Sequence, residues 1–200
     1  MPDRLEIYVV DDDEAVRKSL NFMLRAAGFL VRTYDSAADF LADAKDLGPG
    51  CLLTDVRMPD MDGLELLRRM KAQGLAFPVV VMTGHGDVPL AVEAMKLGAA
   101  DFIEKPFSDE VLLAALGAAR RGVSLNGEAD AQPYKDLVAK LTPREVEVLK
   151  SVVAGHTNKV IGRQFGISPR TVEVHRANLM LKLNVTTLSE LVRTALLAGL

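Results

Sequence analysis

Residues 52 to 59 of the chain read Leu52-Leu53-Thr54-Asp55-Val56-Arg57-Met58-Pro59, an apolar run that ends in an aspartate. A short apolar run of this kind is typical of a strand that is buried on both faces. Open α/β sheets bind their ligands at the carboxyl ends of the strands. The stretch therefore predicts an α/β fold that carries Asp55 at its functional edge.

Similar strand-like runs alternate with helical patterns through the first 121 residues. The runs are 6–10, 30–34, 50–55, 78–82 and 100–104, and the helical patterns are 14–27, 36–44, 63–73, 87–98 and 108–121. Five such repeats imply a parallel sheet with helices on both faces, since crossovers between parallel strands are right-handed. We expect a doubly wound, five-stranded parallel sheet in a first domain of residues 1–121.

Polar residues follow four of these runs. Asp11 and Asp12 follow the first, Thr83 follows Met82 in the fourth, and Lys105 follows the fifth. Together with Asp55, the acids could hold Mg²⁺, and Asp55 could act as a nucleophile that forms an acyl phosphate. Lys105 could pair with a phosphoryl oxygen, and Thr83 could donate to another. Taken singly, these residues also fit a solvated loop, a cap and a surface lysine.

The second half of the chain has a different character. We expect a linker over residues 122–140, because Gly122, Gly127 and Pro133 interrupt the periodicity. Residues 141–200 then form an all-α domain of four helices, at 143–154, 158–165, 169–183 and 188–198. Thr142-Pro143-Arg144-Glu145 has the residues of a capping box.

The helix that begins after Ser168 follows a short helix and a glycine-containing turn, which is a helix-turn-helix layout. Its packed face holds Val172, Leu179 and Leu183. The opposite face offers Glu173 to a cytosine amino group and Val174 to a thymine methyl. The residues expected to meet DNA are Lys159, Ser168, Arg170, Thr171, Glu173, Val174, His175, Arg176 and Lys182. An ion pair between Glu173 and Arg176 is the alternative for those two.

Charge and composition narrow the class of protein. Residues 1–122 carry 14 Lys and Arg against 20 Asp and Glu, whereas residues 123–200 carry 10 against 7. An acidic first part suits a cation site, and a basic second part permits contact with nucleic acid.

Cys51 is the one cysteine and is expected to be a buried thiol. No stretch resembles a membrane span or signal peptide, so we expect a cytoplasmic location.

Residues 5–121 resemble a response-regulator receiver domain. The carriers are Val10-Asp11-Asp12-Asp13, Thr54 through Gly63, Met82-Thr83-Gly84-His85-Gly86-Asp87 and Asp101-Phe102-Ile103-Glu104-Lys105-Pro106-Phe107. The resemblance implies a flavodoxin-like sheet, Mg²⁺ binding and phosphorylation of Asp55 by a sensor histidine kinase. It implies the backbone carbonyl of Arg57 as a further metal ligand and a cis peptide at Lys105-Pro106. It also implies that Thr83 and Phe102 form a switch.

Residues 141–199 resemble the DNA-binding domain of the LuxR/FixJ type. The carriers are Leu141 through Glu145, Val153 through Lys159, and Ser168 through Leu183. The stretches that point to the FixJ branch are Arg57-Met58-Pro59, Thr83 through Asp87 and Ser168 through Asn178. The resemblance implies binding to double-stranded promoter DNA. Many relatives carry a basic residue at the position of Glu173, so their contacts do not transfer there.

Together these patterns predict a two-component response regulator that is not an enzyme. Phosphorylation of Asp55 is expected to make the surface of residues 87–121 pair with a second copy, and the dimer to activate transcription with RNA polymerase and no membrane partner. One alternative is an aspartyl-phosphate hydrolase, although no dedicated base is evident beside Asp55. Another is a DNA-binding protein that ignores phosphate and uses its first domain only to dimerise.

Overall fold

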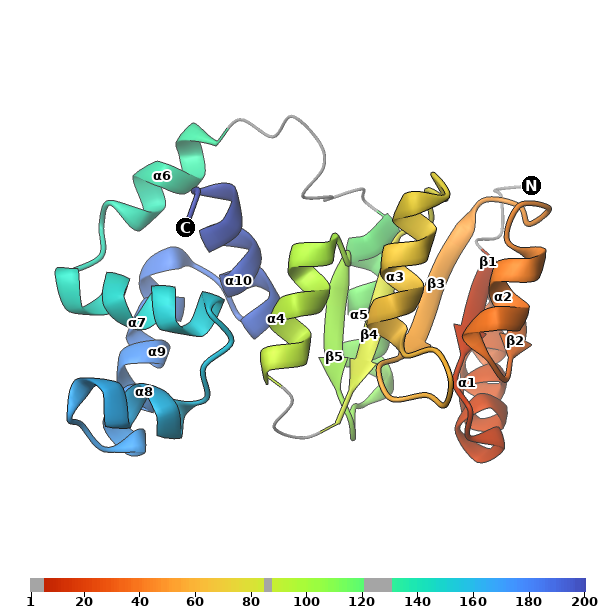
Figure 1. Cartoon of the computed structure of the whole chain (residues 1–200), viewed down its shortest axis with the longest axis horizontal. Coiled ribbons are helices and arrows are strands. Elements are labelled where there is room, and N and C mark those ends of the chain that lie inside the picture. Colours follow the sequence, from red (N-terminus) through yellow and green to blue (C-terminus); the bar gives the residue numbers. More distant parts are fainter. Residues whose placement is uncertain (1–5, 85–87, 121–130) are drawn as a thin grey trace. The chain divides into compact units, whose positions relative to one another are not determined.

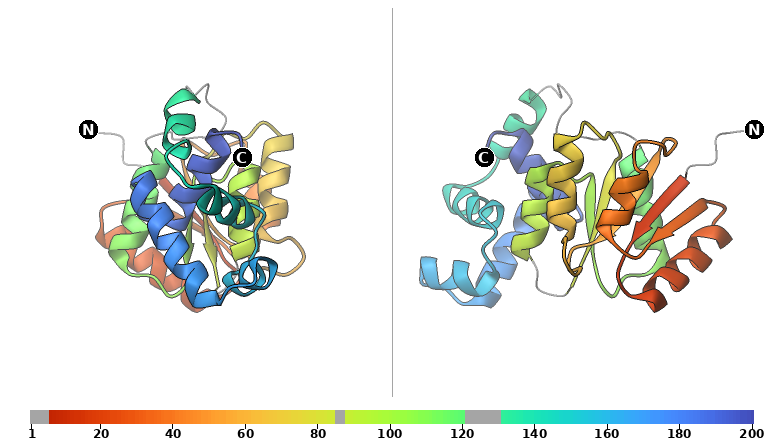
Figure 2. Two further views of the ribbon diagram at one scale, coloured as in Figure 1. Left: turned by 90° about the vertical axis from the view of Figure 1, so that its left-hand side faces the viewer. Right: turned by 45° about the vertical axis from the view of Figure 1, so that its right-hand side comes forward.

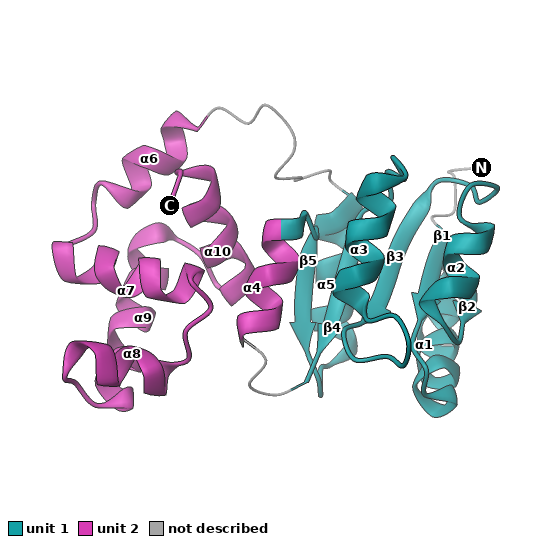
Figure 3. Ribbon diagram, in the orientation of Figure 1, with its two compact units in different colours: residues 1–85, 97–124 teal, residues 86–96, 125–200 magenta. Residues whose placement is uncertain are grey.

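The computed structural model of the chain describes residues 6–84, 88–120 and 131–200. The chain divides into two compact units, residues 1–85 with 97–124 and residues 86–96 with 125–200 (Figure 3).

Five parallel strands form one sheet in the order β2-β1-β3-β4-β5 (Figure 1). They are β1 (Glu6–Val10), β2 (Leu30–Tyr34), β3 (Gly50–Asp55), β4 (Val79–Thr83) and β5 (Asp101–Glu104). This is the flavodoxin-like, doubly wound order, in which the chain reverses direction across the sheet between β1 and β3. The predicted α/β class and the five strands are confirmed, since every strand falls within a residue or two of its predicted range.

Helices cover both faces of the sheet. They are α1 (Glu14–Ala26), α2 (Ala37–Asp43), α3 (Gly63–Ala72) and α5 (Asp109–Arg120), and α4 (Val88–Leu97) follows β4 along the chain. On one face, α1 and α5 bury Leu24 and Leu116 against Val9 and Leu53. On the other face α2 packs beside α3, and Phe40 of α2 meets Tyr8 of β1. The two layers are seen on either side of the sheet in the left view of Figure 2.

The second part of the chain is helical, as predicted. Its helices are α6 (Gln132–Val138), α7 (Pro143–Val153), α8 (Asn158–Phe165), α9 (Pro169–Leu183) and α10 (Leu188–Leu197). Thr142 forms the predicted capping box with Glu145, and both side chains complete the bonds of the first turn of α7.

Helix α6 was not predicted: it lies within residues 122–140, which the sequence pattern assigns to a linker, and the four helices predicted beyond that range are α7 to α10. Pro133 interrupts the helical periodicity of the sequence, but it stands in the first turn of α6, where the lack of an N–H does no harm. The helix packs against α9 and α10 with Tyr134, Leu137 and Val138 half-buried. Residues 121–130 of the predicted linker lie outside the described residues.

Two further expectations concern single features. Cys51 is buried in β3 as predicted, and burial raises the pKa of its thiol to about 12. Within the described ranges, no helix is both long enough and apolar enough to cross a membrane.

Candidate functional site

The ends of the central strands bring the predicted polar residues to one edge of the sheet. Pairing of β3 with β4 sets Asp55 beside Met82, and the backbone N–H of Lys105 donates to the carbonyl of Thr83 at 2.7 Å. Because parallel strands all end at the same edge, side chains that are distant in sequence become neighbours there. Asp11, one residue beyond β1, belongs to the same group.

Lys105 joins the two acids of this group. Its Nζ lies 2.9 Å from Oδ2 of Asp11 and 2.6 Å from Oδ1 of Asp55. Asp11 is buried, and Asp55 is only 9% exposed. The bond between Lys105 and Pro106 is cis, as the family resemblance implied. The structure thus brings together two buried acids and a cation from three separate strand ends.

The pKa of Asp55 reflects two opposed influences. Burial raises the pKa of this carboxyl above its usual range, whereas the bond and charge of Lys105 and the backbone N–H of Arg57, 2.8 Å from Oδ2, lower it. Burial also works against the charge of Lys105, but its bonds to Asp55 and Asp11 outweigh this and raise the pKa of the ammonium. Burial is the larger influence, so the net shift of the Asp55 pKa is upward. The contacts with Lys105 and Arg57 oppose that shift and favour the ionised carboxylate, which is the form that a phosphoryl acceptor needs.

The three acids after β1 have different surroundings. Oδ1 of Asp11 accepts from the backbone N–H of Asp13 at 3.0 Å. The Asp13 carboxylate is the N-cap of α1 and accepts from the N–H of Ala15 at 2.7 Å. Asp12 lies between them and is exposed. Capping therefore occupies Asp13, and Asp12 keeps a carboxylate that can reach a ligand.

The residues at this edge fit a Mg²⁺ ion. The described parts of the chain contain no gathering of three or more His, Cys, Asp or Glu side chains in a metal-holding arrangement. Mg²⁺ needs only one or two carboxylates because it keeps several of its waters. Asp11, Asp12 and Asp55 carry three negative charges at an edge where Lys105 supplies one positive charge, and the repulsion from Asp11 contributes to the raised pKa of Asp55. A divalent cation would relieve that excess.

Thr83 ends β4, and Phe102 is the second residue of the neighbouring strand β5. Thr83 is buried, and its hydroxyl donates to the carbonyl of Gly84 at 3.2 Å. Phe102 in β5 is half-buried and pairs with Val81 across the β4–β5 ladder. The hydroxyl is thus placed at the same edge as Asp55. The remainder of that motif, residues 85–87, lies outside the described residues.

The helix-turn-helix is built from α8 and α9. Gly166 ends α8 with a φ of 66°, in the left-handed region that glycine adopts most easily, and Ser168 caps α9 by accepting from the N–H of Thr171 at 3.0 Å. A Cβ on Gly162 would lie only 2.7 Å from the carbonyl oxygen of Ile167. The turn can therefore pack closely on α8.

The faces of α9 agree with the sequence pattern. Val172, Leu179 and Leu183 are buried, while Arg170, Val174 and Glu173 are exposed. The remaining predicted DNA contacts divide into an exposed group and a half-buried group: Lys159, Ser168, Thr171 and Lys182 are exposed, and His175 and Arg176 are half-buried.

Two of the predicted cations have partners inside the helical domain. Arg176 donates from Nη1 to Oδ1 of Asn158 at 2.8 Å and so ties α9 to α8. Nζ of Lys182 lies 2.8 Å from Oε2 of Glu145, which is buried in α7. Glu173 pairs with Arg170 at 3.0 Å, so its ion pair forms toward the start of the helix and not with Arg176 as the alternative supposed.

Two arginines make contacts that were not predicted from the sequence. Arg144 donates to the carbonyl of Phe165 at 3.2 Å and lies over its ring at 4.2 Å, which links α7 to the end of α8. Arg17 of α1 donates to the backbone carbonyls of Asp11 and Asp12. Arg17 stands in no distinctive pattern, and Arg144 stands in a capping motif whose function does not use its side chain. The partners of both are evident only once the helices are packed.

A five-stranded sheet with acids and a lysine at its carboxyl edge, followed by a helix-turn-helix, defines a response regulator with a DNA-binding domain. Comparisons with known proteins agree: residues 7–117 match the model of the response regulator receiver domain, and residues 139–195 match that of the bacterial regulatory proteins of the luxR family. The chain belongs to the FixJ type of two-component response regulators, which are transcriptional regulators and not enzymes.

The relatives resemble the chain over its whole length. The transcriptional regulatory protein FixJ of Bradyrhizobium diazoefficiens is 55% identical over 97% of this chain and 96% of its own length. FixJ of Rhizobium meliloti is 52% identical over 96% of both. The crystal structure of full-length FixJ from B. japonicum covers 98% of each chain at 52% identity, with a TM-score of 0.58.

Proposed function

We propose that Asp55 accepts a phosphoryl group from a sensor histidine kinase. A carboxylate oxygen of Asp55 attacks the phosphorus, the phosphorus–nitrogen bond of the kinase's phosphohistidine breaks, and the electron pair of that bond stays on the histidine nitrogen. The observation that carries this proposal is the position of Lys105, whose ammonium is 2.6 Å from the accepting carboxylate. The same ammonium can form an ion pair with an oxygen of the transferred phosphoryl group.

Mg²⁺ is the cation that we assign to this site. Asp11, Asp12, Asp55 and the backbone carbonyl of Arg57 would hold it, and when bound it would neutralise charge on the transferred group. Lys105 and the hydroxyl of Thr83 bind phosphoryl oxygens from the other side. The buried position of Asp11 and the short contacts of Lys105 support this division of roles.

Thr83 and Phe102 form the switch in this proposal. When the hydroxyl of Thr83 turns toward the phosphoryl group, it vacates space that the ring of Phe102 can fill. The surface over residues 87–121 then pairs with a second copy; residues 87 and 121 at its ends lie outside the described residues. Thr83 is buried two residues beyond Val81, which pairs with Phe102 on the adjacent strand, and these positions support a coupling between the two residues.

The dimer binds double-stranded promoter DNA through α8 and α9 and activates transcription with RNA polymerase in the cytoplasm. Paired recognition helices meet two half-sites about one helical turn apart. Residues 1–121 act as the receiver, 122–140 as a linker that includes α6, and 141–200 as the DNA-binding domain. The predicted contacts all remain in the proposed interface, but the internal bonds of Arg176 and Lys182 suit helix packing as well as phosphate contact.

Replacement of Asp55 tests the acceptor directly. The full chain with Asp55→Asn should show no phosphorylated band on a phosphate-affinity gel after incubation with a small acyl phosphate and Mg²⁺, because an amide cannot accept the group.

Asp60→Asn is the matched control for that experiment. Asp60 lies in the same loop with a φ of 62°, a conformation that asparagine adopts readily. This variant should be phosphorylated like the wild type. A phosphorylated band that persists in Asp55→Asn would place the acceptor elsewhere.

A further inference from the structure

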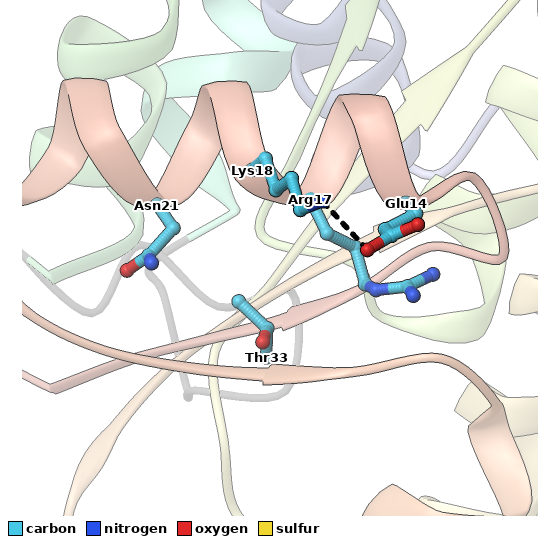
Figure 4. A pocket seen from close by; sticks show the side chains of 5 residues that line it. All are labelled: Glu14, Arg17, Lys18, Asn21 and Thr33. Carbon is cyan, nitrogen blue, oxygen red and sulfur yellow. Dashed lines mark ion pairs between the residues drawn. The ribbon is translucent and has the colours of Figure 1, made fainter.

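Arg17 makes an unusual pair of bonds beside the proposed metal site. Its Nη1 donates to the backbone carbonyl of Asp11 at 2.7 Å and to that of Asp12 at 2.8 Å. In Figure 4 the guanidinium points away from Asn21 and toward the start of α1. A single nitrogen that bonds two consecutive carbonyls fixes the orientation of both peptide planes, because each carbonyl is rigid with its peptide.

These two peptides carry the acids of the site. The side chain of Asp11 is held by Lys105 and by the N–H of Asp13, and Asp13 is held as the cap of α1. The carboxylate of Asp12 is exposed, so its direction depends on the backbone from which it leaves. The bonds from Arg17 fix that backbone on both sides of the Asp12 side chain.

We propose that Arg17 is a positioning residue, which holds the Asp11–Asp12 backbone so that the carboxylate of Asp12 faces the divalent cation. This inference rests on the proposed function of the same site. The charge of Arg17 by itself repels a cation nearby. If Arg17 strengthens cation binding, it must therefore do so by positioning the Asp11–Asp12 backbone. Loss of Arg17 would weaken binding if positioning dominates and strengthen it if charge repulsion dominates.

The test is the affinity of the full chain for Mg²⁺ alone, measured by isothermal titration calorimetry. Arg17→Met should weaken binding by about tenfold, the scale typical of lost support for a metal ligand. Lys18→Met is the control: Lys18 is the next residue of α1, its side chain is 74% exposed, and it pairs with Glu14, so the same charge is lost without the two carbonyl bonds. It should bind Mg²⁺ as the wild type does or slightly more tightly.

Two further variants keep the test decisive if Arg17→Met fails to fold, which thermal unfolding in the presence of a chelator would show. Arg17→Gln removes the charge and shortens the side chain, and should also weaken binding. Arg17→Lys still has a donor for one carbonyl and should recover part of the affinity.

The possible outcomes separate the two proposals. Mg²⁺ binding in folded Arg17→Met or Arg17→Gln that equals or exceeds that of the wild type would overturn the role of Arg17 and leave the metal site intact. If the wild type itself binds no Mg²⁺, the proposed metal site fails and the role of Arg17 fails with it.

Discussion

Gly63 carries no side chain, and the structure leaves no room for one. It is the first residue of α3, and its N–H donates to the carbonyl of Val56 at 2.9 Å. A Cβ at this position would overlap the carbonyl oxygen of Asp55. The start of α3 therefore lies directly against the backbone of the proposed phosphoacceptor, and the shape of the site depends on a glycine that has no chemical role.

Gly63→Ala should displace the backbone of Asp55. We expect the free energy of unfolding to fall by about 1–3 kcal/mol, as for other overpacked positions, and phosphorylation by an acyl phosphate to slow. Urea unfolding and the initial rate of phosphorylation measure the two effects. Gly48→Ala is the control, because a Cβ there meets no atom within 4 Å. If Gly63→Ala and Gly48→Ala change the free energy of unfolding and the rate of phosphorylation equally, the close packing assigned to Gly63 is contradicted.

The residues at the site differ in how far the sequence reveals them. Asp11, Asp55 and Lys105 could be grouped in advance because each follows an apolar run, and parallel strands end at one edge. The bonds of Arg17 could not be foreseen, since they depend on the exact path of the loop before α1. Strand ends are encoded locally, whereas backbone contacts of a side chain are a product of packing.

Among the helices, Glu145 links α7 to α9. Its Oε2 accepts from the ammonium of Lys182 at 2.8 Å and from the N–H of Thr142 at 2.8 Å. The bond with Lys182 is the main reason that the pKa of Glu145 falls from 4.5 to about 2, and the bond with Thr142 adds to it. One buried carboxylate thus completes a helix cap and an ion pair between two helices.

The depressed pKa gives a pH dependence of known sign. Glu145 stabilises the fold at pH values above 4.5, and this contribution is lost as the pH falls toward about 2. Glu145→Gln should therefore be less stable than the wild type near neutral pH, and the difference should shrink across that window. Amide hydrogen exchange of α7 and α9 at several pH values measures this difference in stability between the variant and the wild type.

Glu147→Gln serves as the control for this pH effect. Glu147 lies on the same helix, but its side chain is 54% exposed. The variant should follow the wild type at every pH. A stability difference for Glu145→Gln that stays constant down to pH values near 2 would contradict the assigned role of the carboxylate.

The exposed face of α9 carries the proposed DNA contacts. Arg170 is more exposed than Lys182, the other cation of α9 with an ion pair in the described residues, since 86% of its side chain is exposed against 41%. Arg170→Ala should weaken DNA binding about equally across sequences and reduce the slope of log affinity against log salt by about 1. Fluorescence anisotropy at several salt concentrations measures both. Lys150→Ala, at an exposed position of α7, should leave the slope unchanged; an unchanged slope in Arg170→Ala would remove Arg170 from the interface.

Elements could be predicted where a local pattern decides them. The strands follow from apolar runs, and α7 follows from its capping box. Helix α6 could not be predicted in this way, because it has no side-chain cap and buries none of its residues fully, so that packing on α9 and α10 is what stabilises it. The pairing of Lys182 with Glu145 joins residues 37 positions apart and likewise required the fold.

At the scale of the whole molecule, the chain joins an acidic receiver to a basic helical part. Residues 1–122 carry 20 acids against 14 Lys and Arg, and residues 123–200 carry 7 against 10. The acidic part suits a site that attracts a divalent cation, and the basic part suits phosphates of DNA. The central claim is that a phosphoryl group on Asp55 in the first part changes the affinity of the second part for DNA.

The most direct measurement of that claim is the DNA affinity of the full chain with and without phosphorylation, on a fragment selected by footprinting genomic DNA. Treatment of the wild type with an acyl phosphate and Mg²⁺ should tighten binding by about tenfold or more, within the usual range of coupling between two sites. Asp55→Asn, treated in the same way, should bind as the untreated wild type does. Equal affinity of the phosphorylated and unphosphorylated wild type would contradict the account and favour a DNA-binding protein that ignores phosphate.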